Sequence, residues 1–317
     1  MQHRNVLVLG GSGFIGRHIV NLLVGRGCRV RVPSRRRDRA KHLITLPTCD
    51  VVEANVHDDA ALDGLIDGQH AVINLVGILH GTQADFDRVN LELPRRVIAA
   101  CASRGVRRYL HMSALGADPN GPSIYQRSNG AGEELVRACP LDWTIFKPSV
   151  VFGAEDEFLN LFARLAAVFP VLPIGGADVR FQPVWVEDVA AAFANSLDNE
   201  ATYRKSYELA GPRVYTLREL VRFAACAAGH PRPVIALPDA LARLQAAVME
   251  HLPGPTLLSR DNLDSMKRDN IASQQPYQPA PELGLPHLMP LEPEASLYLA
   301  RLHPRTRFGG FRAKARR

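Results

Sequence analysis

The stretch VLVLGGSGFIGR, residues 6–17, decides the fold of this chain. A short apolar run at residues 6–9 is typical of a buried strand, and apolar residues then repeat at helical spacing from Ile15 onward. A glycine-rich turn between a buried strand and a helix lets backbone N–H groups approach a pyrophosphate at the helix N-terminus. The alternative is a glycine turn that binds nothing, but the strand–turn–helix context favours a dinucleotide site. The residues assigned to this site are Gly10, Ser12, Gly13, Phe14, Ile15 and Gly16.

Composition sets the broad class of the protein. The chain has 317 residues, of which 46% are hydrophobic and 22% charged, as in ordinary globular proteins with a large core. Its five cysteines are scattered without a C-x-x-C pair, which indicates a reducing compartment. The first strand begins by residue 5, so we expect no signal peptide, and no apolar run approaches the roughly 18 residues of a membrane-spanning helix. The histidines and cysteines show no metal-ligand spacing, so no metal site is expected.

The net charge of +6 is concentrated at the C-terminus. Residues 301–317 carry seven arginines and lysines and no acidic residue, which leaves the rest of the chain with a net charge of −1. A nucleic-acid-binding protein needs a basic face on the fold itself, so no nucleic-acid partner is expected. Most basic tails of this kind are solvated, disordered chain ends. The functional alternative is that the tail makes peripheral contact with an anionic membrane.

Strand and helix patterns alternate through the first half of the chain. Such alternation predicts right-handed βαβ units and a parallel sheet that helices cover on both faces. The expected fold is therefore α/β, a Rossmann-type doubly wound parallel sheet with a smaller C-terminal lobe. Three parts are expected. Residues 1–152 form an NADP-binding domain, to which segments about 178–210 return. Residues 153–300 form a smaller substrate or partner lobe, and residues 301–317 form a basic tail. Strands are expected at residues 6–9, 29–32, 51–54, 71–76, 109–112, 143–146 and 206–209.

The end of the second expected strand indicates which dinucleotide binds. A site for NAD(H) places an Asp or Glu about 20 residues after the glycine motif, where it holds the ribose hydroxyls. Here Arg35, Arg36 and Arg37 stand at that position, and no carboxylate occurs until Asp38. Arginine binds phosphate through its planar set of donors, so the sequence favours NADP(H) over NAD(H). A solvated charge run on a loop is the structural alternative.

Six further motifs follow the glycine turn: NLVG at residues 74–77, HMSALGA at 111–117, YQRSNGAGE at 125–133, FKPSVVFG at 146–153, FQPVWVEDVA at 181–190 and SRDNLDSM at 259–266. Together with the glycine turn, they resemble the motifs of extended or atypical short-chain dehydrogenase/reductases. Within this superfamily the chain most resembles the group of the nucleotide-binding accessory subunit of respiratory complex I and its bacterial relatives, and a related member of the group takes part in ubiquinone synthesis. The likeness covers roughly residues 4–300.

The resemblance implies further contacts with the dinucleotide. Asn55, Val56 and Asp58 correspond to positions that bracket the adenine after the third strand. Val76 and Gly77 correspond to backbone that passes the ribose after the fourth strand. Each position has a structural alternative: Asp58 as a helix cap, for example, and Gly77 as the end of a strand.

At the nicotinamide end, the resemblance implies a contact with Pro148 and a group that transfers a proton. In this superfamily that group is a Ser or Thr, a Tyr that also contacts the cofactor, and a Lys four residues after the Tyr. Ser113 and Tyr125 match the first two, but the lysine position is Asn129. A lysine there would lower the tyrosine pKa, whereas asparagine carries no charge and can only hydrogen-bond a ribose hydroxyl. Tyr125 is then either a poorly tuned catalytic acid or a structural aromatic residue.

Two functions follow from these expectations. The first is an NAD(P)H-binding accessory or assembly factor linked to respiratory complex I or quinone metabolism, cytoplasmic and peripheral at the inner face of the membrane. The second is an active NADPH-dependent reductase or isomerase that acts on a small quinone-like or isoprenoid-like substrate. Asn129 favours the first function, and the presence of Ser113 and Tyr125 keeps the second open.

Overall fold

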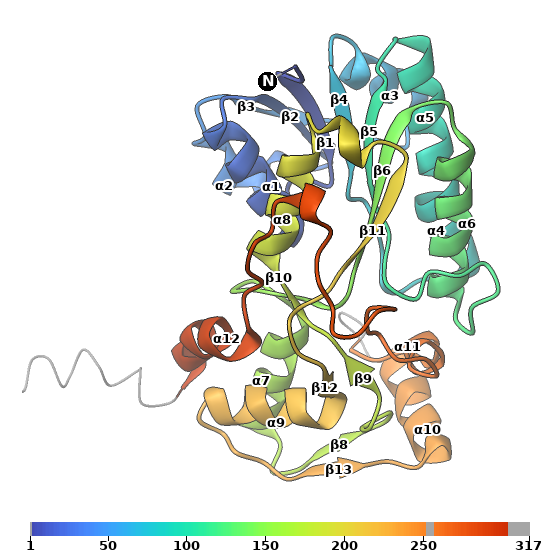
Figure 1. Cartoon of the computed structure of the whole chain (residues 1–317). Coiled ribbons are helices and arrows are strands. Elements are labelled where there is room, and N and C mark those ends of the chain that lie inside the picture. The colour runs from blue at the N-terminus through green and yellow to red at the C-terminus, as the bar shows by residue number, and fades with distance from the viewer. Residues whose placement is uncertain (1, 252–256, 304–317) are drawn as a thin grey trace, which may run out of the picture. The chain divides into compact units, whose positions relative to one another are not determined.

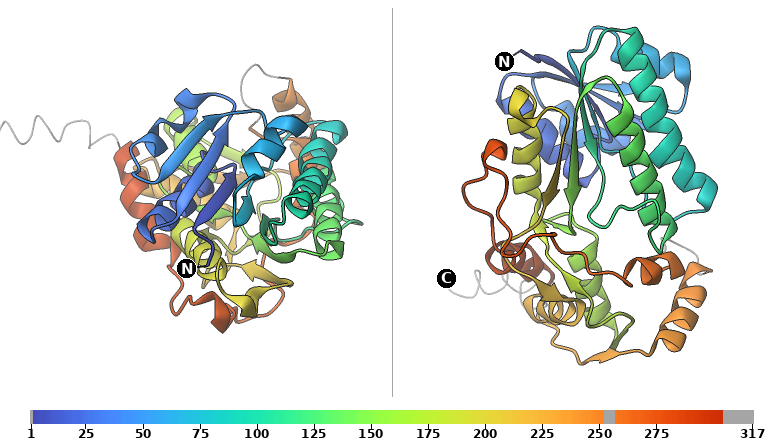
Figure 2. Two further views of the ribbon diagram at one scale, coloured as in Figure 1. Left: turned by 90° about the horizontal axis from the view of Figure 1, so that it is seen from above. Right: turned by 45° about the vertical axis from the view of Figure 1, so that its right-hand side comes forward.

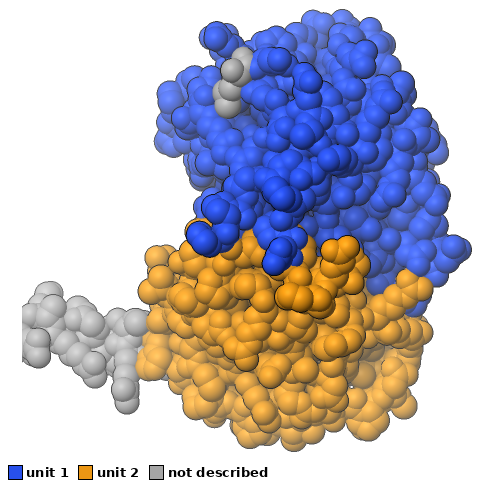
Figure 3. Space-filling view, viewed as in Figure 1, with its two compact units in different colours: residues 1–148, 186–209, 278–287 blue, residues 149–185, 210–277, 288–317 orange. Residues whose placement is uncertain are grey.

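The structure is a computed structural model that describes residues 2–251 and 257–303. The chain divides into two compact units (Figure 3). Unit 1 comprises residues 1–148, 186–209 and 278–287, and unit 2 comprises residues 149–185, 210–277 and 288–317. Most of the predicted basic tail, residues 304–317, lies outside the described residues.

A seven-stranded parallel sheet forms the centre of unit 1 (Figure 1). From one edge to the other its strands are β3 (Cys49–Glu53), β2 (Arg29–Ser34), β1 (Asn5–Leu9), β4 (Ala71–Asn74), β5 (Arg108–Met112), β6 (Asp142–Pro148) and β11 (Lys205–Leu209). The direction of winding reverses between β1 and β4, and ligands of such sheets bind beside this point, at the carboxyl ends of the strands. The predicted doubly wound α/β fold is confirmed.

Helices cover both faces of this sheet, which explains why its central strands are apolar at successive positions. The four residues 6–9 of β1 are all fully buried. One face carries α1 (Phe14–Gly25), α2 (Lys41–Ile44) and α8 (Val186–Ser196), and the other carries α3 (Asp59–Ile66), α5 (Leu93–Ser103) and α6 (Ile124–Ala138) (Figure 2). The short helices of this unit are η1 (Arg37–Ala40), α4 (Gln83–Asp87), the π-helix η2 (Arg88–Glu92), η3 (Glu200–Thr202) and η4 (Pro281–Leu283).

Helix α8 and strand β11 come from a segment that is distant in sequence from the rest of unit 1. Strand β11 pairs in parallel with β6 and completes the sheet. The buried guanidinium of Arg108 on β5 donates hydrogen bonds to the carbonyl oxygens of Ser196 (2.6 Å) and Leu197 (3.0 Å). It also donates to the carbonyl oxygen of Asp142 (2.7 Å), and burial lowers the pKa of Arg108 to about 10. One charged side chain therefore ties the returning segment to the sheet.

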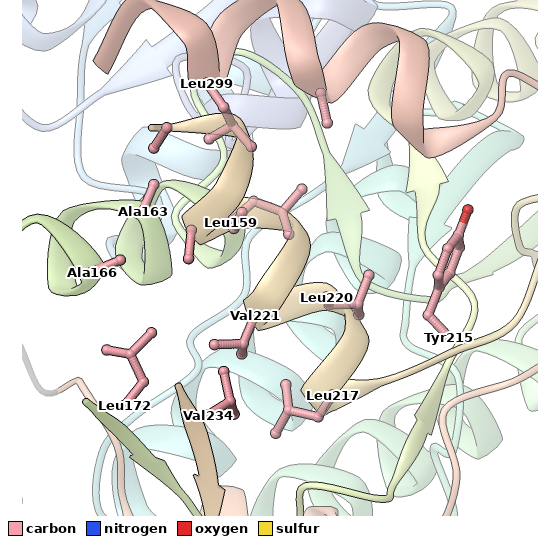
Figure 4. Close-up of a cluster of buried hydrophobic side chains, with 14 of the residues drawn as sticks. Leu159, Ala163, Ala166, Leu172, Tyr215, Leu217, Leu220, Val221, Val234 and Leu299 are labelled. Atoms are coloured by element: carbon pink, nitrogen blue, oxygen red, sulfur yellow. The ribbon is translucent and has the colours of Figure 1, made fainter. Parts of the chain in front are cut away.

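Unit 2 is organised around an apolar core between three helices (Figure 4). Leu159 on α7, Leu220 on α9 and Leu299 on α12 are almost fully buried there. The helices of this unit are α7 (Phe158–Val168), α9 (Leu217–Ala227), α10 (Asp239–Glu250), α11 (Arg260–Ser265), α12 (Leu291–Leu299) and the short η5 (Ala300–Leu302). Its strands pair as β7 (Val151–Phe152) with β10 (Val184–Trp185), β9 (Arg180–Phe181) with β12 (Tyr215–Thr216), and β8 (Leu172–Ile174) with β13 (Val234–Ala236).

The two units differ in detail from the domain limits expected from the sequence. Residues 178–185 were assigned to the first domain, but they belong to unit 2 because β9 and β10 find their strand partners there. Residues 278–287 belong to unit 1, where the hydroxyl of Tyr207 on β11 donates a hydrogen bond to the Oε1 of Glu282 in η4 (2.9 Å). No local sequence pattern predicts that residues 278–287 join unit 1.

Candidate functional site

The turn between β1 and α1 is built from glycine residues, and its backbone geometry at Gly10 is unusual. Gly10 takes a positive φ of 80°, which residues with side chains rarely adopt, and the backbone N–H of Gly13 donates to the Gly10 carbonyl (3.0 Å). Helix α1 begins at Phe14 with Gly13 as its N-cap, so no side chain caps it, and its first turn holds no acidic residue. Its first N–H groups and the positive end of its dipole are therefore available to an anionic ligand.

Two glycines also allow backbone segments to approach more closely than a side chain permits. A Cβ on Gly16 would lie 2.3 Å from the carbonyl oxygen of Gly10, so α1 packs directly on the turn. A Cβ on Gly10 would lie 3.1 Å from the carbonyl carbon of Leu75 and 3.2 Å from the nitrogen of Val76. The glycine turn thus lies against the segment after β4 that contains the predicted ribose contacts, Val76 and Gly77.

A buried polar chain holds this segment after β4. The Oδ1 of Asn74 accepts a hydrogen bond from the Val76 N–H (3.2 Å), and its Nδ2 donates to the Tyr109 hydroxyl (3.2 Å). The Nδ1 of His111 lies 3.2 Å from the same hydroxyl. Burial lowers the pKa of His111 to about 4, so its imidazole is neutral at physiological pH. The chain of side chains therefore fixes a turn of backbone at the carboxyl edge of the sheet.

Arg35 and Arg36 lie at the end of β2, and both side chains are exposed. The Ser34 hydroxyl donates to the Arg36 carbonyl (2.8 Å) and fixes the backbone there. Arg36 pairs with Asp38 (Nη2 to Oδ2, 2.7 Å), which lowers the pKa of that carboxyl, so a phosphate would compete with Asp38 for this guanidinium. Burial lowers the pKa of His57, and nearby positive charges, that of Arg35 included, lower it further. Arg35 therefore lies close to the loop after β3.

The loop after β3 carries the predicted adenine contacts Asn55, Val56 and Asp58. The Oδ1 of Asn55 accepts from the His57 N–H (3.1 Å), which closes a local turn. The Oδ1 of Asp58 accepts from the Ala61 N–H (2.8 Å), so Asp58 caps α3. The structural role that the sequence left open for Asp58 is thus present, and the contact of these three residues with adenine stays a prediction.

Tyr125 and Asn129 are four residues apart on α6 and share one face of it. Tyr125 packs edge-on against Phe86, with 6.3 Å between the ring centroids, and burial raises the pKa of Tyr125 to about 12. The Nδ2 of Asn129 donates to the backbone carbonyl of Tyr125 (2.8 Å). A catalytic acid for neutral pH needs a pKa below that of an ordinary tyrosine, and here the pKa moves the other way.

Ser113, just after β5, is bound to a buried carboxylate. Its hydroxyl donates to the Oε1 of Glu133 (2.6 Å), and both residues are almost fully buried. The Oε2 of Glu133 accepts from Arg137 (2.9 Å), and the Nζ of Lys147 lies 3.6 Å from Oε1. The proton of the Ser113 hydroxyl is therefore committed to a carboxylate that two cations balance.

The carboxyl ends of β5 and β6 are joined by their backbones. The Ser113 N–H donates to the Phe146 carbonyl (2.8 Å), and the Leu115 N–H donates to the Pro148 carbonyl (2.9 Å). Pro148, the predicted nicotinamide contact, is buried at this edge. Ser113 and Pro148 thus lie on adjacent strand ends.

Comparison with known proteins identifies the family. A family model described as NAD(P)H-binding matches residues 10–159. The chain is 31% identical over 282 residues to NADH dehydrogenase (ubiquinone) 1 alpha subcomplex subunit 9 of Arabidopsis thaliana, with 84% of this chain and 70% of that protein covered. The chain belongs to the subunit 9 family. It is also 33% identical to the ceramide reductase of Caulobacter vibrioides, with 74% of each chain covered.

Membership of the subunit 9 family confirms the resemblance seen in the sequence and a nicotinamide dinucleotide as the cofactor. The chain spans 59% to 70% of the length of the subunit 9 proteins that it matches. Among solved structures, the NADPH-dependent quinone oxidoreductase QOR2 of Escherichia coli has the same fold. Its TM-score is 0.73 at 19% identity, over 93% of this chain and 99% of that one.

Glu133 is a residue of this candidate site that the sequence did not single out. It follows Asn129 by four positions and Tyr125 by eight, so all three share one face of α6. That spacing was the sequence signal that could have identified Glu133 as a site residue. Its contact with Ser113 required the structure, because Ser113 lies on a different element.

Two kinds of feature are absent from the described part of the chain. Within residues 2–251 and 257–303, no group of three or more His, Cys, Asp or Glu side chains is placed to hold a metal ion. In the same residues, no helix has the length and apolar character to cross a membrane.

Proposed function

We propose that this protein holds NADPH as a bound component and acts as an accessory or assembly factor of a membrane-associated respiratory or quinone-synthesis complex. The observation that carries the proposal is the state of its proton-transfer group. Burial raises the pKa of Tyr125, and neutral Asn129 replaces the lysine that would lower it. Ser113 donates its proton to Glu133 and not toward a substrate carbonyl. A bound dinucleotide would then stabilise the folded protein by mass action without being consumed.

The preference for NADP(H) over NAD(H) is part of this proposal. Arg35 and Arg36 offer two exposed guanidinium groups at the end of β2, where a 2′-phosphate would lie beside the ribose. The first carboxylate after the strand, Asp38, is paired with Arg36 and is not presented to a ribose hydroxyl. The expected contacts along the dinucleotide are those assigned from the sequence, from Gly10 to Pro148.

The proposed place of action is the cytoplasmic side, peripheral at the inner face of the membrane. Relatives named as subunits of mitochondrial NADH dehydrogenase support a position beside a respiratory complex. The basic segment 301–317, of which 304–317 lie outside the described residues, is proposed to contact anionic lipid. Binding to anionic liposomes should fall with salt and vanish on deletion of 301–317. Equal sedimentation of intact and deleted protein with these liposomes would contradict the membrane contact.

Nucleotide content and turnover together test the proposal. The protein is purified without added nucleotide and denatured, and the released nucleotide is identified by chromatography, with NADPH as the expected result. The loaded protein is then mixed with quinones and carbonyl compounds while nicotinamide absorbance is followed. Oxidation no faster than that of free NADPH supports the accessory role. Sustained turnover that Tyr125→Phe abolishes would overturn it.

A second function, an NADPH-dependent reductase or isomerase on a quinone-like or isoprenoid-like substrate, has a specific observation in its favour. Ser113 and Tyr125 occupy the superfamily's positions, and a relative with 33% identity is named ceramide reductase. This function requires the Ser113 hydroxyl to leave Glu133 when substrate binds. The turnover experiment above separates the two functions.

A further inference from the structure

Unit 2 contains an apolar cavity that the dinucleotide chemistry does not use. It lies among α7, β8, α10 and the segment at Leu257 and Leu258, and its volume is about 190 Å³. Among the described residues that line it, none is charged and Gln245 is the one polar side chain. An apolar cavity of this volume holds a small apolar group, such as a few carbons of a hydrocarbon chain.

The cavity is apolar from its inner wall to its mouth. Leu172 and Leu217 in the wall are almost fully buried, whereas Phe169 and Leu257 line the same cavity and are 51% and 40% exposed. The exposed pair therefore marks where the cavity opens. Water gains no hydrogen bonds along such walls, so an apolar occupant is favoured over an aqueous one.

Gln245 gives the cavity one polar feature. Its Nε2 donates to the Pro173 carbonyl (3.3 Å), and its Oε1 is buried with no hydrogen-bond partner among the described residues. A buried acceptor without a donor is unfavourable, so an occupant with one O–H or N–H group near this side chain would satisfy it.

Helix α10, which carries Gln245, also has an exposed apolar face. Leu241, Leu244 and Val248 are 52%, 61% and 55% exposed, and their spacing places them on one side of the helix. The small residues Ala242 and Ala246 are buried on another side. Large apolar residues gathered on one exposed helix face are typical of a surface that contacts the apolar part of a membrane.

We propose that this cavity binds one end of a hydrocarbon chain of a membrane lipid, acyl or prenyl, with Gln245 accepting a hydrogen bond from a hydroxyl or amide at that end. The exposed face of α10 supplies an apolar route from a bilayer to the mouth. An anionic or nucleotide ligand is disfavoured because the described part of the lining contains no cation. The proposal is independent of the nucleotide site, since it concerns only residues of unit 2.

The test uses the full-length protein and the fluorescent fatty acid cis-parinaric acid, whose emission rises in apolar surroundings. The parent protein should bind it saturably, and Phe169→Asp with Leu257→Asp should weaken binding about tenfold, because two charges then stand at the mouth. The matched control, Ile235→Asp with Leu297→Asp, places the same charges at exposed apolar positions outside the cavity lining and should leave binding unchanged. Unaltered NADPH affinity shows that both variants are folded.

Competition identifies the chain type and tests Gln245. Displacement by oleyl alcohol or by geranylgeraniol distinguishes an acyl from a prenyl source. Oleyl alcohol should displace the probe better than methyl oleate from the parent, because only the alcohol donates a hydrogen bond, and Gln245→Leu should remove this difference. No saturable binding by the parent, or equal weakening in the mouth variant and its control, would overturn the proposal.

Discussion

The hydroxyl of Ser113 donates a hydrogen bond of 2.6 Å to the carboxylate of Glu133, twenty positions further along the chain. A hydroxyl has one proton, so this bond and a bond to a substrate carbonyl exclude each other. Arg137 pairs with Oε2 of Glu133, and Lys147 lies near the Oε1 that accepts from Ser113, so two cations balance this carboxylate. Ser113 thus occupies the position of a catalytic serine, but its proton is engaged inside the protein.

Glu133→Ala should destabilise the protein strongly. The change leaves the partly buried ammonium of Lys147 without its carboxylate, and breaking such a pair costs about 3 kcal/mol of unfolding free energy. Urea denaturation measures the loss. Glu134→Ala, at the exposed neighbouring position, should change stability by less than about 0.5 kcal/mol. Equal small effects of the two substitutions would contradict the structural importance of Glu133.

Asn129→Lys should lower the pKa of Tyr125 from about 12 toward the ordinary value for tyrosine. A positive charge one helical turn away favours the phenolate, so any slow oxidation of NADPH by quinones should become faster. Tyrosine absorbance followed against pH, in difference from Tyr125→Phe, measures the shift. Asn129→Leu carries no charge and should leave both quantities as they are. An unchanged tyrosine titration in the lysine variant would refute this account.

Arg35→Ala with Arg36→Ala should weaken NADPH binding at least about tenfold and leave NADH binding nearly unchanged, because charge-assisted hydrogen bonds to the 2′-phosphate are lost. Calorimetry with both nucleotides measures the difference. Arg39→Ala removes an equally exposed charge from η1 and serves as the control. Equal affinity of the unmodified protein for NADH and NADPH would remove the basis of the assignment.

Gly16→Ala should abolish or greatly weaken nucleotide binding. The added methyl group would lie 2.3 Å from the Gly10 carbonyl oxygen, so either α1 or the glycine turn must move. Gly25→Ala in the same helix meets no atom within 4 Å and should keep affinity and raise stability by about 0.5–1 kcal/mol. Calorimetric affinity and thermal unfolding of both variants check the pair. Full nucleotide affinity in the Gly16 variant would be incompatible with this geometry.

The buried imidazole of His111 should make stability depend on pH between 6.5 and 4. Its pKa is about 4 in the folded protein against 6.5 in the unfolded chain, so in this range the unfolded chain binds more protons. The contribution is complete above pH 6.5 and is lost as pH falls, by about 3 kcal/mol in all. Urea unfolding at several pH values in this range gives the free energy of unfolding as a function of pH. This free energy should change less with pH in His111→Gln than in the parent, whereas exposed His287→Gln should match the parent. Identical slopes for all three proteins would contradict a neutral buried His111.

The strands of unit 1 were predictable because each is a short apolar run, but their ends were not. Strand β4 was expected to continue to Val76 and ends at Asn74, whose own side chain accepts the Val76 N–H and turns the backbone. Strand β6 extends past the apolar run to Lys147 and Pro148, because all five residues of β11 pair with residues 144–148 of β6. Side-chain bonds and long-range pairing decided both limits, and neither is visible in local hydrophobicity.

The candidate site shows the same division. The glycine turn is a local feature, so its position could be inferred from spacing alone, and the family comparison confirms the cofactor class. The engagement of Ser113 by Glu133 joins two elements, and the burial that raises the Tyr125 pKa depends on residues such as Phe86 that are distant in sequence. Such effects arise only when the chain is folded.

The late arrival of β11 has a consequence for biosynthesis. On a ribosome that adds about 5–20 residues per second, the 57 positions from Pro148 to Lys205 take roughly 3–11 s to make. During that interval the outer edge of β6 has no strand beside it. Arg108 also lacks two of its hydrogen-bond acceptors, the carbonyl oxygens of Ser196 and Leu197, until those residues have been made. The nascent chain therefore presents an open sheet edge, which is prone to pair with other chains.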